Sequence, residues 1–277
     1  CSGGDNINAR FLDECSHLDV ISQFAVGYDN IDIAKATDLG IPVGYTPDVL
    51  THATAEIGFG LMIAVARKMF YNHKSILKGE WTYFKPRANL GLELKNKTLG
   101  IFGLGRIGFE MARLCKNAYN MDILYHNRNR NNRADKELDA RFVDFDTLLS
   151  ESDVISVHCS LTDETKEVFN KSAFSKMKSS AIFINTARGK VHNEIDLIEA
   201  LKSGLIWGAG LDVTNPEPML PDNQLLSMEN VAVLPHIGSA TVETRNRMAK
   251  LVAENIIEFY RDNKMSCIVN PESLQKR

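Results

Sequence analysis

Short apolar runs alternate with amphipathic segments through the middle of the chain. Two of these segments, 107–118 and 194–203, carry apolar residues at the three- and four-residue spacing of a helix. Strands that alternate with helices are typical of βαβ units, so the pattern predicts an α/β fold with a doubly wound parallel sheet. The expected strands are residues 98–102, 122–125, 154–158, 181–185, 208–213 and 231–234.

The two ends of the chain differ from this central pattern. Residues 53–70, rich in small and apolar side chains, predict one long helix, and 241–260 predict an amphipathic helix. Gly204 follows the helical segment 194–203, at a position where a left-handed cap is expected. The first fifty residues contain one strand-like run at 20–25, and they predict part of a second, smaller domain.

Composition and charge narrow the class of protein. The chain has 277 residues, 44% hydrophobic and 24% charged, which suits a soluble globular protein with a full core. A net charge of −3 gives no general attraction to nucleic acid or to a membrane surface, so neither is expected as a partner. The apolar stretch 57–66 is too short to span a bilayer. Five scattered cysteines without a CxxC pair predict reduced thiols, a cytoplasmic location and no metal site.

A glycine-rich turn joins the first predicted strand of the sheet to its helix. Residues 99–108 read LGIFGLGRIG, which places GxGxxG at Gly103, Gly105 and Gly108. In a dinucleotide-binding fold Gly103 would permit the tight turn, Gly105 the approach of a pyrophosphate, and Gly108 close packing of helix on strand. The helix N-terminus would face the phosphates. The alternative is a glycine-rich turn of some other doubly wound protein.

The next strand ends without the acidic residue that NAD-binding folds usually carry about 20 residues past the glycines. Asn127 stands there, followed by Arg128, Asn129 and Arg130. Without a repelling carboxylate, the arginines make a site that attracts a 2′-phosphate, which predicts NADP(H) over NAD(H), with use of both left open. The alternative is that Arg128, Arg130 and Arg133 solvate a surface loop.

Arg188, Glu217 and His236 follow three successive predicted strands. The carboxyl ends of parallel strands form the ligand crevice, so all three should face one cleft. Arg188 could grip a carboxylate and polarise a ketone, and His236 could exchange a proton. Glu217 could bond the other ring nitrogen of His236 and keep the ring protonated. The set fits hydride transfer between a nicotinamide and a small 2-keto acid.

Each of these three residues also has a plain structural interpretation. Arg188 could belong to a surface ion pair, Glu217 could be part of a proline-bounded loop, and His236 could cap the helix that follows. Spacing alone leaves both interpretations open.

Several motifs in a fixed order carry a resemblance that covers the chain from residue 26 to about residue 260. Besides the glycine loop, they are VGYDNID at 26–32, TPDVLT at 46–51, TARG at 186–189, and the runs at 212–218 and 235–241. The chain resembles the D-isomer-specific 2-hydroxyacid dehydrogenases, most closely the glyoxylate/hydroxypyruvate reductase branch.

The resemblance implies roles for particular residues. Arg188, Glu217 and His236 would be catalytic, and the backbone N–H groups of Val26 and Gly27 would bind the substrate carboxylate. Asp212 would meet the nicotinamide carboxamide. Further cofactor contacts would come from Leu104, Gly105, Arg106, Ile107, Asn127, Arg128, Asn129, Thr186, Ala187 and Gly238.

The resemblance also implies the domain plan. Residues 50–241 would form a Rossmann-type NAD(P)-binding domain, and 1–49 with 242–277 a flavodoxin-like substrate domain. Family members are longer at the N-terminus by about one βαβ unit, so this substrate domain is expected to be incomplete. The long helix after Thr51 would pack in a homodimer interface. Trp81 and Tyr83 would either reach a neighbouring subunit's cleft or serve in packing.

Two other functions remain open at this point. One is a non-enzymatic NAD(H)-binding corepressor, a role that this family includes. The other is D-3-phosphoglycerate dehydrogenase, which often carries a regulatory domain absent here. Formate dehydrogenases of the family pair their histidine with Gln, so Glu217 argues against that activity. The substrate is expected to be a 2-keto acid such as glyoxylate, hydroxypyruvate, pyruvate or 2-ketogluconate.

Overall fold

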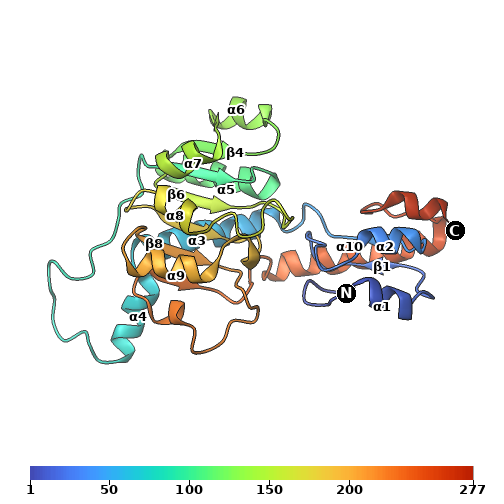
Figure 1. Cartoon of the computed structure of the whole chain (residues 1–277), viewed down its shortest axis with the longest axis horizontal. Coiled ribbons are helices and arrows are strands. Elements are labelled where there is room, and N and C mark those ends of the chain that lie inside the picture. Colours follow the sequence, from blue (N-terminus) through green and yellow to red (C-terminus); the bar gives the residue numbers. More distant parts are fainter. Residues whose placement is uncertain (277) are drawn as a thin grey trace. The chain divides into compact units, whose positions relative to one another are not determined.

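The computed structural model describes residues 1–276, which divide into two compact units (Figure 1). Unit 1 consists of residues 1–53 and of the described residues from 239 onward, and unit 2 of Thr54–Gly238. Among the described residues, no helix is long and apolar enough to cross a membrane.

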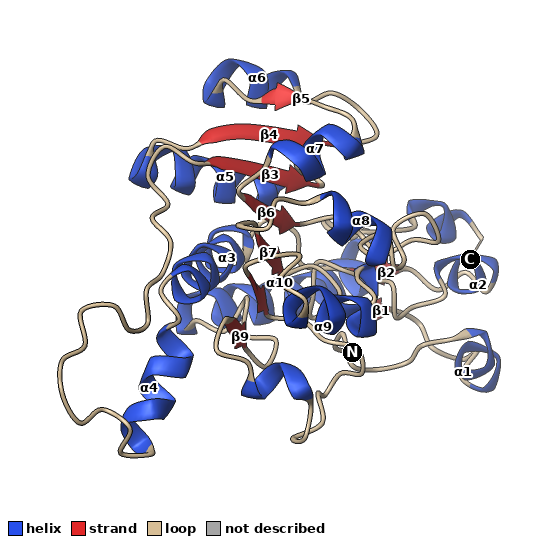
Figure 2. Ribbon diagram, turned by 60° about the vertical axis from the view of Figure 1, so that its left-hand side comes forward, coloured by secondary structure: helices blue, strands red, loops and turns tan. Residues whose placement is uncertain are grey.

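Unit 2 is built on a seven-stranded sheet whose neighbouring strands are all parallel, in the order β5-β4-β3-β6-β7-β8-β9 (Figure 2). The chain winds outward in both directions from β3 and β6, which makes the sheet doubly wound as predicted. All six predicted strands are present, and the short, exposed β5 was not predicted. The strands are β3 Thr98–Phe102, β4 Asp122–His126, β5 Arg141–Phe142, β6 Val154–Val157, β7 Ile182–Asn185, β8 Gly208–Leu211 and β9 Val231–Val233.

Helices cover both faces of this sheet because alternate strand residues point to opposite sides. In β7, Ile182 and Ile184 join the core on the side of α3 (Thr51–Ala66) and α5 (Arg106–Tyr119), whereas Phe183 joins the opposite core. That second core is covered by α7 (Phe145–Glu151), α8 (Lys171–Lys176) and α9 (Glu194–Lys202). The remaining helical elements of unit 2 are α4 Met69–Leu77, α6 Asn132–Leu138, η1 Gly189–Val191 and η2 Gln224–Ser227.

Local capping chemistry fixes the bounds of α9. Asn193 accepts a hydrogen bond from the backbone N–H of Asp196 at the N-terminus, which satisfies one of the unpaired amides of the first turn. Gly204 has φ +70° just past the other end, so the left-handed cap predicted there is confirmed.

The prediction of a single helix over 53–70 is wrong at the C-terminal end of that range. Helix α3 stops at Ala66, Lys68 takes a left-handed conformation with φ 49°, and α4 starts at Met69. The returning chain explains the break, because Leu92 donates its N–H to the carbonyl of Ala66 at 2.8 Å. A continuous helix would need that carbonyl for residue 70.

Unit 1 is smaller and holds two parallel strands, β1 Ile21–Ser22 and β2 Val43–Gly44, with a core around Leu12, Ile41 and Val43. The strand expected over 20–25 is therefore shorter than predicted. Its helical elements are α1 Ala9–Glu14, α2 Ile33–Asp38, α10 Val242–Asp262 and η3 Pro271–Gln275.

Buried Asn270 joins the end of the chain to the strands of unit 1. Its Oδ1 accepts from Val43 N at 2.8 Å, and its Nδ2 donates to Ile41 O at 3.1 Å and to Thr37 Oγ1 at 3.0 Å. The two ends of the sequence thus share one hydrogen-bonded core.

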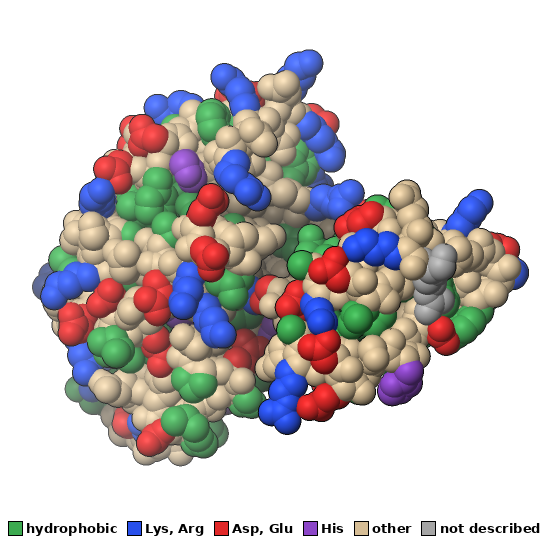
Figure 3. Space-filling view, turned by 45° about the vertical axis from the view of Figure 1, so that its right-hand side comes forward, with side chains coloured by type: hydrophobic (Ala, Val, Ile, Leu, Met, Phe, Trp, Pro, Cys, Tyr) green, Lys and Arg blue, Asp and Glu red, His purple; other side chains and the backbone are tan. Residues whose placement is uncertain are grey.

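Acidic and basic side chains are interspersed over the face shown in Figure 3. Several ion pairs among the described residues are exposed, such as Arg10 with Glu14 at 2.9 Å and Arg133 with Glu137 at 2.8 Å. Exposed pairs contribute little to stability, but mixing the two signs leaves that face without a broad field of one sign.

Candidate active site

Arg188, Glu217 and His236 lie just past the carboxyl ends of β7, β8 and β9, which are neighbours in the sheet. Glu217 Oε1 and His236 Nδ1 are 2.5 Å apart, and the two side chains are 41% and 48% exposed. The pair therefore forms a tight hydrogen bond at a position that solvent, and hence a small ligand, can reach. His236 Nε2 is left as the ring nitrogen available to a substrate.

The backbone around His236 is held by Asp212, which is 1% exposed. His236 itself has φ 53°, and its N–H bonds the carbonyl of Asp212 at 2.9 Å. The two carboxylate oxygens of Asp212 accept from Ile237 N and Gly238 N, both at 2.8 Å. These two hydrogen bonds of Asp212 could not be predicted from the sequence. Because each oxygen keeps a further lone pair, the predicted contact of Asp212 with a carboxamide stays a prediction.

The electrostatics of the site favour a charged pair. The hydrogen bond that His236 donates to Glu217 raises the pKa of His236, although burial and the charge of Arg188 oppose the change. Burial acts to raise the pKa of Glu217, but the hydrogen bond and charge of His236 outweigh it, and the pKa of Glu217 is lowered. The pair therefore holds a proton on His236 to higher pH than a free imidazole would.

Close packing fixes the loop that carries Arg188 against the loop that carries Glu217. A methyl group on Gly189 would lie 1.9 Å from the carbonyl oxygen of Thr214, so the backbones touch where no side chain fits. Arg188 Nη1 donates to Ala187 O at 2.7 Å. Its charge influences the pKa of both Glu217 and His236, which places the guanidinium in their electrostatic neighbourhood.

The glycine loop after β3 has the geometry that a dinucleotide needs. Gly103 has φ +90°, and a methyl group there would lie 2.6 Å from Cys159 N. One on Gly108 would lie 2.9 Å from Ile101 Cγ2, whereas the space above Gly105 is open. Within residues 1–276 the N-cap Gly105 of α5 makes no side-chain capping bond, and a helix N-terminus of this kind favours a pyrophosphate. The residues present therefore fit the cofactor.

Asn127 holds this loop from the end of β4. Its Oδ1 accepts from Leu104 N at 2.6 Å, and its Nδ2 donates to Leu104 O at 3.2 Å. Asn131 Nδ2 also reaches Leu104 O, at 3.3 Å. An aspartate at 127 could accept the first bond but could not donate the second. Asn127 thus holds the backbone of Leu104, and it also places no negative charge at this position.

The three arginines near a prospective 2′-phosphate are not equivalent. Arg130 pairs with Asp135 at 2.5 Å, and Arg133 pairs with Glu137 and also lies 4.1 Å from the centroid of the Phe109 ring. Within residues 1–276, Arg128 has no ion-pair partner and its side chain is exposed, as is that of Asn129. Of the arginines, Arg128 is therefore the one whose charge is not already paired.

Thr186 and Ala187 are both nearly buried, at 9% exposure. Thr186 Oγ1 lies 3.3 Å from His158 Nδ1, and Ser156 Oγ lies 2.8 Å from His158 Nε2. Burial lowers the pKa of His158 to about 3, so this ring is neutral. His158 is a neighbour of the predicted site that the sequence did not single out.

Val26 and Gly27 belong to unit 1. Gln23, which is buried, donates from Nε2 to Gly27 O at 3.2 Å and to Asn30 Oδ1 at 2.8 Å, and so shapes this segment. Their predicted role in substrate binding stays a prediction.

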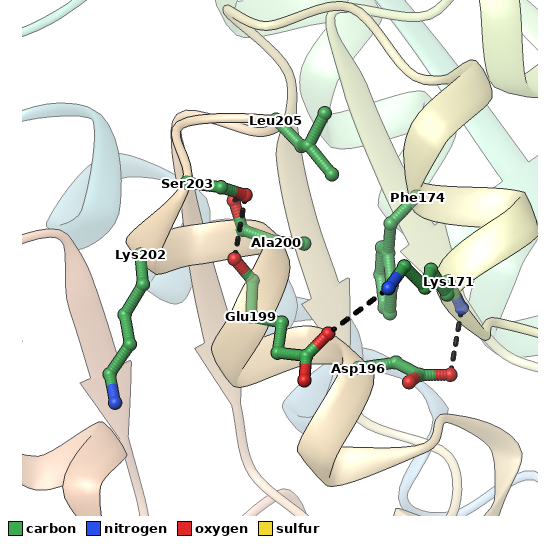
Figure 4. Close-up of a pocket in the computed structure, with 8 residues that line it drawn as sticks. All are labelled: Lys171, Phe174, Asp196, Glu199, Ala200, Lys202, Ser203 and Leu205. Atoms are coloured by element: carbon green, nitrogen blue, oxygen red, sulfur yellow. Dashed lines mark hydrogen bonds and ion pairs between the residues drawn. The ribbon is translucent and has the colours of Figure 1, made fainter.

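A hollow of about 530 Å³ lies between α8 and α9 in unit 2 (Figure 4). In its lining, Lys171 Nζ reaches Glu199 at 3.5 Å and the backbone N–H of Lys171 donates to Asp196 at 2.8 Å. None of the predicted catalytic residues lines it. Within residues 1–276 no cluster of His, Cys, Asp or Glu is arranged to hold a metal ion.

Comparison with known proteins matches this chain to one family. The profile of the D-isomer specific 2-hydroxyacid dehydrogenase NAD-binding domain matches residues 59–238. A glyoxylate reductase of Thermococcus litoralis is 46% identical over 274 residues, which is 98% of this chain and 82% of that protein. A probable 2-ketogluconate reductase of Dictyostelium discoideum is 41% identical over 270 residues, 98% of this chain and 81% of its own.

The fold of this chain is also similar to that of a solved structure. The NADPH-dependent glyoxylate/hydroxypyruvate reductase of Sinorhizobium meliloti, in complex with NADP and malonate, superposes with a TM-score of 0.88. It is 32% identical, and the match covers 98% of this chain and 83% of that one.

The chain belongs to the D-isomer specific 2-hydroxyacid dehydrogenase family. Within the family it falls in the glyoxylate/hydroxypyruvate reductase branch, and it is an oxidoreductase that acts on CH–OH groups.

The Glu217–His236 pair predicts a particular pH dependence. In the direction of reduction His236 must carry its proton, so kcat/KM should be highest at low pH and fall as pH rises through the raised pKa of His236. Glu217→Gln removes the cause of the raised pKa and should move this decline to lower pH, with a loss at neutral pH of about tenfold or more. A pH series of kcat/KM for both proteins measures the shift. An unmoved decline in the variant would contradict the role of the pair.

Proposed function

We propose that the protein reduces glyoxylate and hydroxypyruvate with NADPH, using Arg188, Glu217 and His236 at the carboxyl ends of β7, β8 and β9. The observation that carries the proposal is the 2.5 Å bond between Glu217 and His236, which raises the pKa of the half-exposed ring and leaves its Nε2 for the substrate. The chemistry of the residues also supports it: Arg188 supplies a cation for the substrate carboxylate, and His236 supplies an acid for the developing alkoxide.

When bound, the cofactor supplies the hydride. Arg188 binds the carboxylate of the keto acid through its forked guanidinium and draws charge toward the carbonyl oxygen. His236 donates its Nε2 proton to that oxygen, and Glu217 stabilises the imidazolium before the transfer. Asp212 acts on the same step by fixing the backbone after His236.

Relatives support the choice of substrate class. Both the T. litoralis and the S. meliloti proteins are named as glyoxylate reductases, while the D. discoideum relative is named for 2-ketogluconate. The site accounts for what these acids share, a carboxylate beside a ketone. We therefore propose glyoxylate and hydroxypyruvate first and larger 2-keto acids as slower substrates.

Activity can be tested by following the loss of NADPH absorbance with glyoxylate, hydroxypyruvate, pyruvate and 2-ketogluconate. His236→Ala should lower kcat/KM about 10²- to 10⁴-fold, because the proton donor is lost. His17→Ala, which removes an exposed histidine in unit 1, is the matched control and should leave the rate unchanged.

The same assay separates the two other candidate functions. A corepressor-like protein would bind the cofactor, detected as a thermal shift, and turn over none of these acids. A preference for 3-phosphohydroxypyruvate over hydroxypyruvate would indicate D-3-phosphoglycerate dehydrogenase chemistry instead.

We also propose that NADP(H) is preferred and that Arg128 makes the preference. Arg128 is exposed and directly follows Asn127, which bonds Leu104 of the glycine loop, whereas the charges of Arg130 and Arg133 are already paired. The NADP complex of the S. meliloti relative is in keeping with this choice.

Arg128→Ala should therefore raise KM for NADPH about ten- to hundredfold, the size of one lost charge-assisted hydrogen bond, with little effect on NADH. Arg133→Ala is the control and should change KM for NADPH far less. Steady-state kinetics with both cofactors measures this. A wild-type preference for NADH, or equal effects of the two substitutions, would contradict the assignment.

A homodimer is the third part of the proposal. Helix α4 has no buried residue, and with the segment 78–97 it extends away from the sheet of unit 2 (Figures 1 and 2). This arm exposes Leu77, Trp81 and Phe84 at 75%, 71% and 83%. Several large, exposed apolar side chains in one segment favour an interface. A second copy of the chain is the occupant that the family resemblance favours.

Light scattering after size exclusion tests the dimer. The wild-type chain of 30.9 kDa should elute at twice that mass, and Leu77→Ser with Trp81→Ser and Phe84→Ser should elute at the mass of one chain. The matched control replaces exposed Leu205 and Ile195 of unit 2 by Ser and should stay dimeric. A monomeric wild-type protein would refute this part alone.

A further inference from the structure

Asn185, the last residue of β7, has no exposed surface and contacts the loop that carries Arg188. Its Oδ1 accepts from Ala187 N at 2.9 Å, and its Nδ2 donates to Arg188 O at 2.9 Å. The second hydrogen of Nδ2 faces His192 Nδ1 at 3.0 Å. Three groups on both sides of the predicted catalytic arginine thus converge on one buried amide.

The two backbone groups show which atom of this amide accepts and which donates. The N–H of Ala187 can only donate and the carbonyl of Arg188 can only accept, so Oδ1 and Nδ2 of Asn185 cannot be exchanged. It follows that His192 Nδ1 must accept, and that the proton of the neutral ring sits on Nε2.

His192 is suited to this accepting role. It follows η1, is fully buried, and packs on Phe183 with ring centroids 5.8 Å apart. Burial lowers its pKa to about 4, so the ring stays neutral. Its Nε2 finds no hydrogen-bond partner among residues 1–276. A buried unpaired N–H is unfavourable, which argues that the histidine is kept for its Nδ1 and not for overall stability.

We infer that Asn185 is a positioning residue that sets the backbone of Arg188, and that His192 fixes the amide of Asn185 in the required orientation. This inference rests on the proposed role of Arg188 as the group that binds the carboxylate of the substrate. The loop has little freedom of its own, since Gly189 is pressed against Thr214 O on its other side. Asn185 therefore sets the backbone position from which the side chain of Arg188 extends.

Asn185→Asp tests the inference with the smallest change of shape. The new carboxylate can still accept from Ala187 N, but it repels the carbonyl of Arg188, to which the amide donated. KM for glyoxylate should rise about tenfold or more, the effect of losing one buried hydrogen bond, and KM for NADPH should change by less than about threefold. Because a protonated carboxyl can donate again, the ratio of variant to wild-type KM should shrink as pH falls.

Asn170→Asp is the matched control. Asn170 also accepts two backbone N–H groups, from Ser172 and Ala173, and donates to a backbone carbonyl, that of Glu167, but it caps α8. The same chemical change there should lower the unfolding midpoint without moving KM for glyoxylate. Equal behaviour of the two variants would overturn the inference.

A second pair of variants covers the case in which Asn185→Asp does not fold. His192→Leu removes the acceptor and should raise KM for glyoxylate, whereas His192→Asn, which restores an acceptor near the place of Nδ1, should return KM toward wild type. A loss of stability in both variants with unchanged KM would contradict the inference.

Binding of oxalate, measured by calorimetry, separates this inference from the proposed function. Oxalate presents a carboxylate to Arg188 without turnover, and Asn185→Asp should weaken its binding about tenfold. A wild-type protein that binds oxalate in this Asn185-dependent way but reduces no keto acid would leave the positioning role standing and refute the activity. If the wild-type protein is active but Asn185→Asp leaves its oxalate binding unchanged, the activity stands and the positioning role of Asn185 is refuted.

Discussion

The loops after β7, β8 and β9 touch at their backbones, and the predicted active site depends on that contact. Gly189 lies so close to the carbonyl of Thr214 that a methyl group would be 1.9 Å from the oxygen. Parallel strands that are neighbours in a sheet bring their carboxyl ends together, so three residues from distant parts of the sequence reach one place. Buried polar side chains then fix each loop: Asn185 bonds the loop of Arg188, and Asp212 bonds the loop of His236.

The two acidic side chains of the site, buried Asp212 and partly exposed Glu217, contribute differently: one fixes geometry and the other supplies charge. The Asp212 carboxylate is satisfied by backbone amides, whereas the Glu217 carboxylate faces the imidazole directly and changes its protonation. Two acidic residues a few positions apart therefore act in different ways. The same division appears at the cofactor loop, where Asn127 holds Leu104 and Arg128 offers its charge.

The periodic parts of the fold could be predicted from the sequence, because burial on both faces leaves continuous apolar runs such as the one at residues 181–184. The order of the motifs likewise indicated the family. The break after Ala66 could not be predicted, since it depends on Leu92, which returns from a distant part of the chain. The pairing of Arg130 and Arg133, and the tasks of Asn185 and Asp212, depend on contacts made only in the folded chain. The sequence alone shows that such residues are polar, but it does not show which groups they pair or hydrogen-bond with.

The most direct test of the account is an NMR titration of the His236 ring in the whole protein. Specific isotope labelling of histidine and the variant His236→Gln would assign its signal among the seven histidines. The account predicts a pKa above that of an ordinary imidazole in the wild-type protein, and a lower pKa in Glu217→Gln. A His236 pKa at or below the ordinary value, unchanged when Glu217 loses its charge, would contradict it.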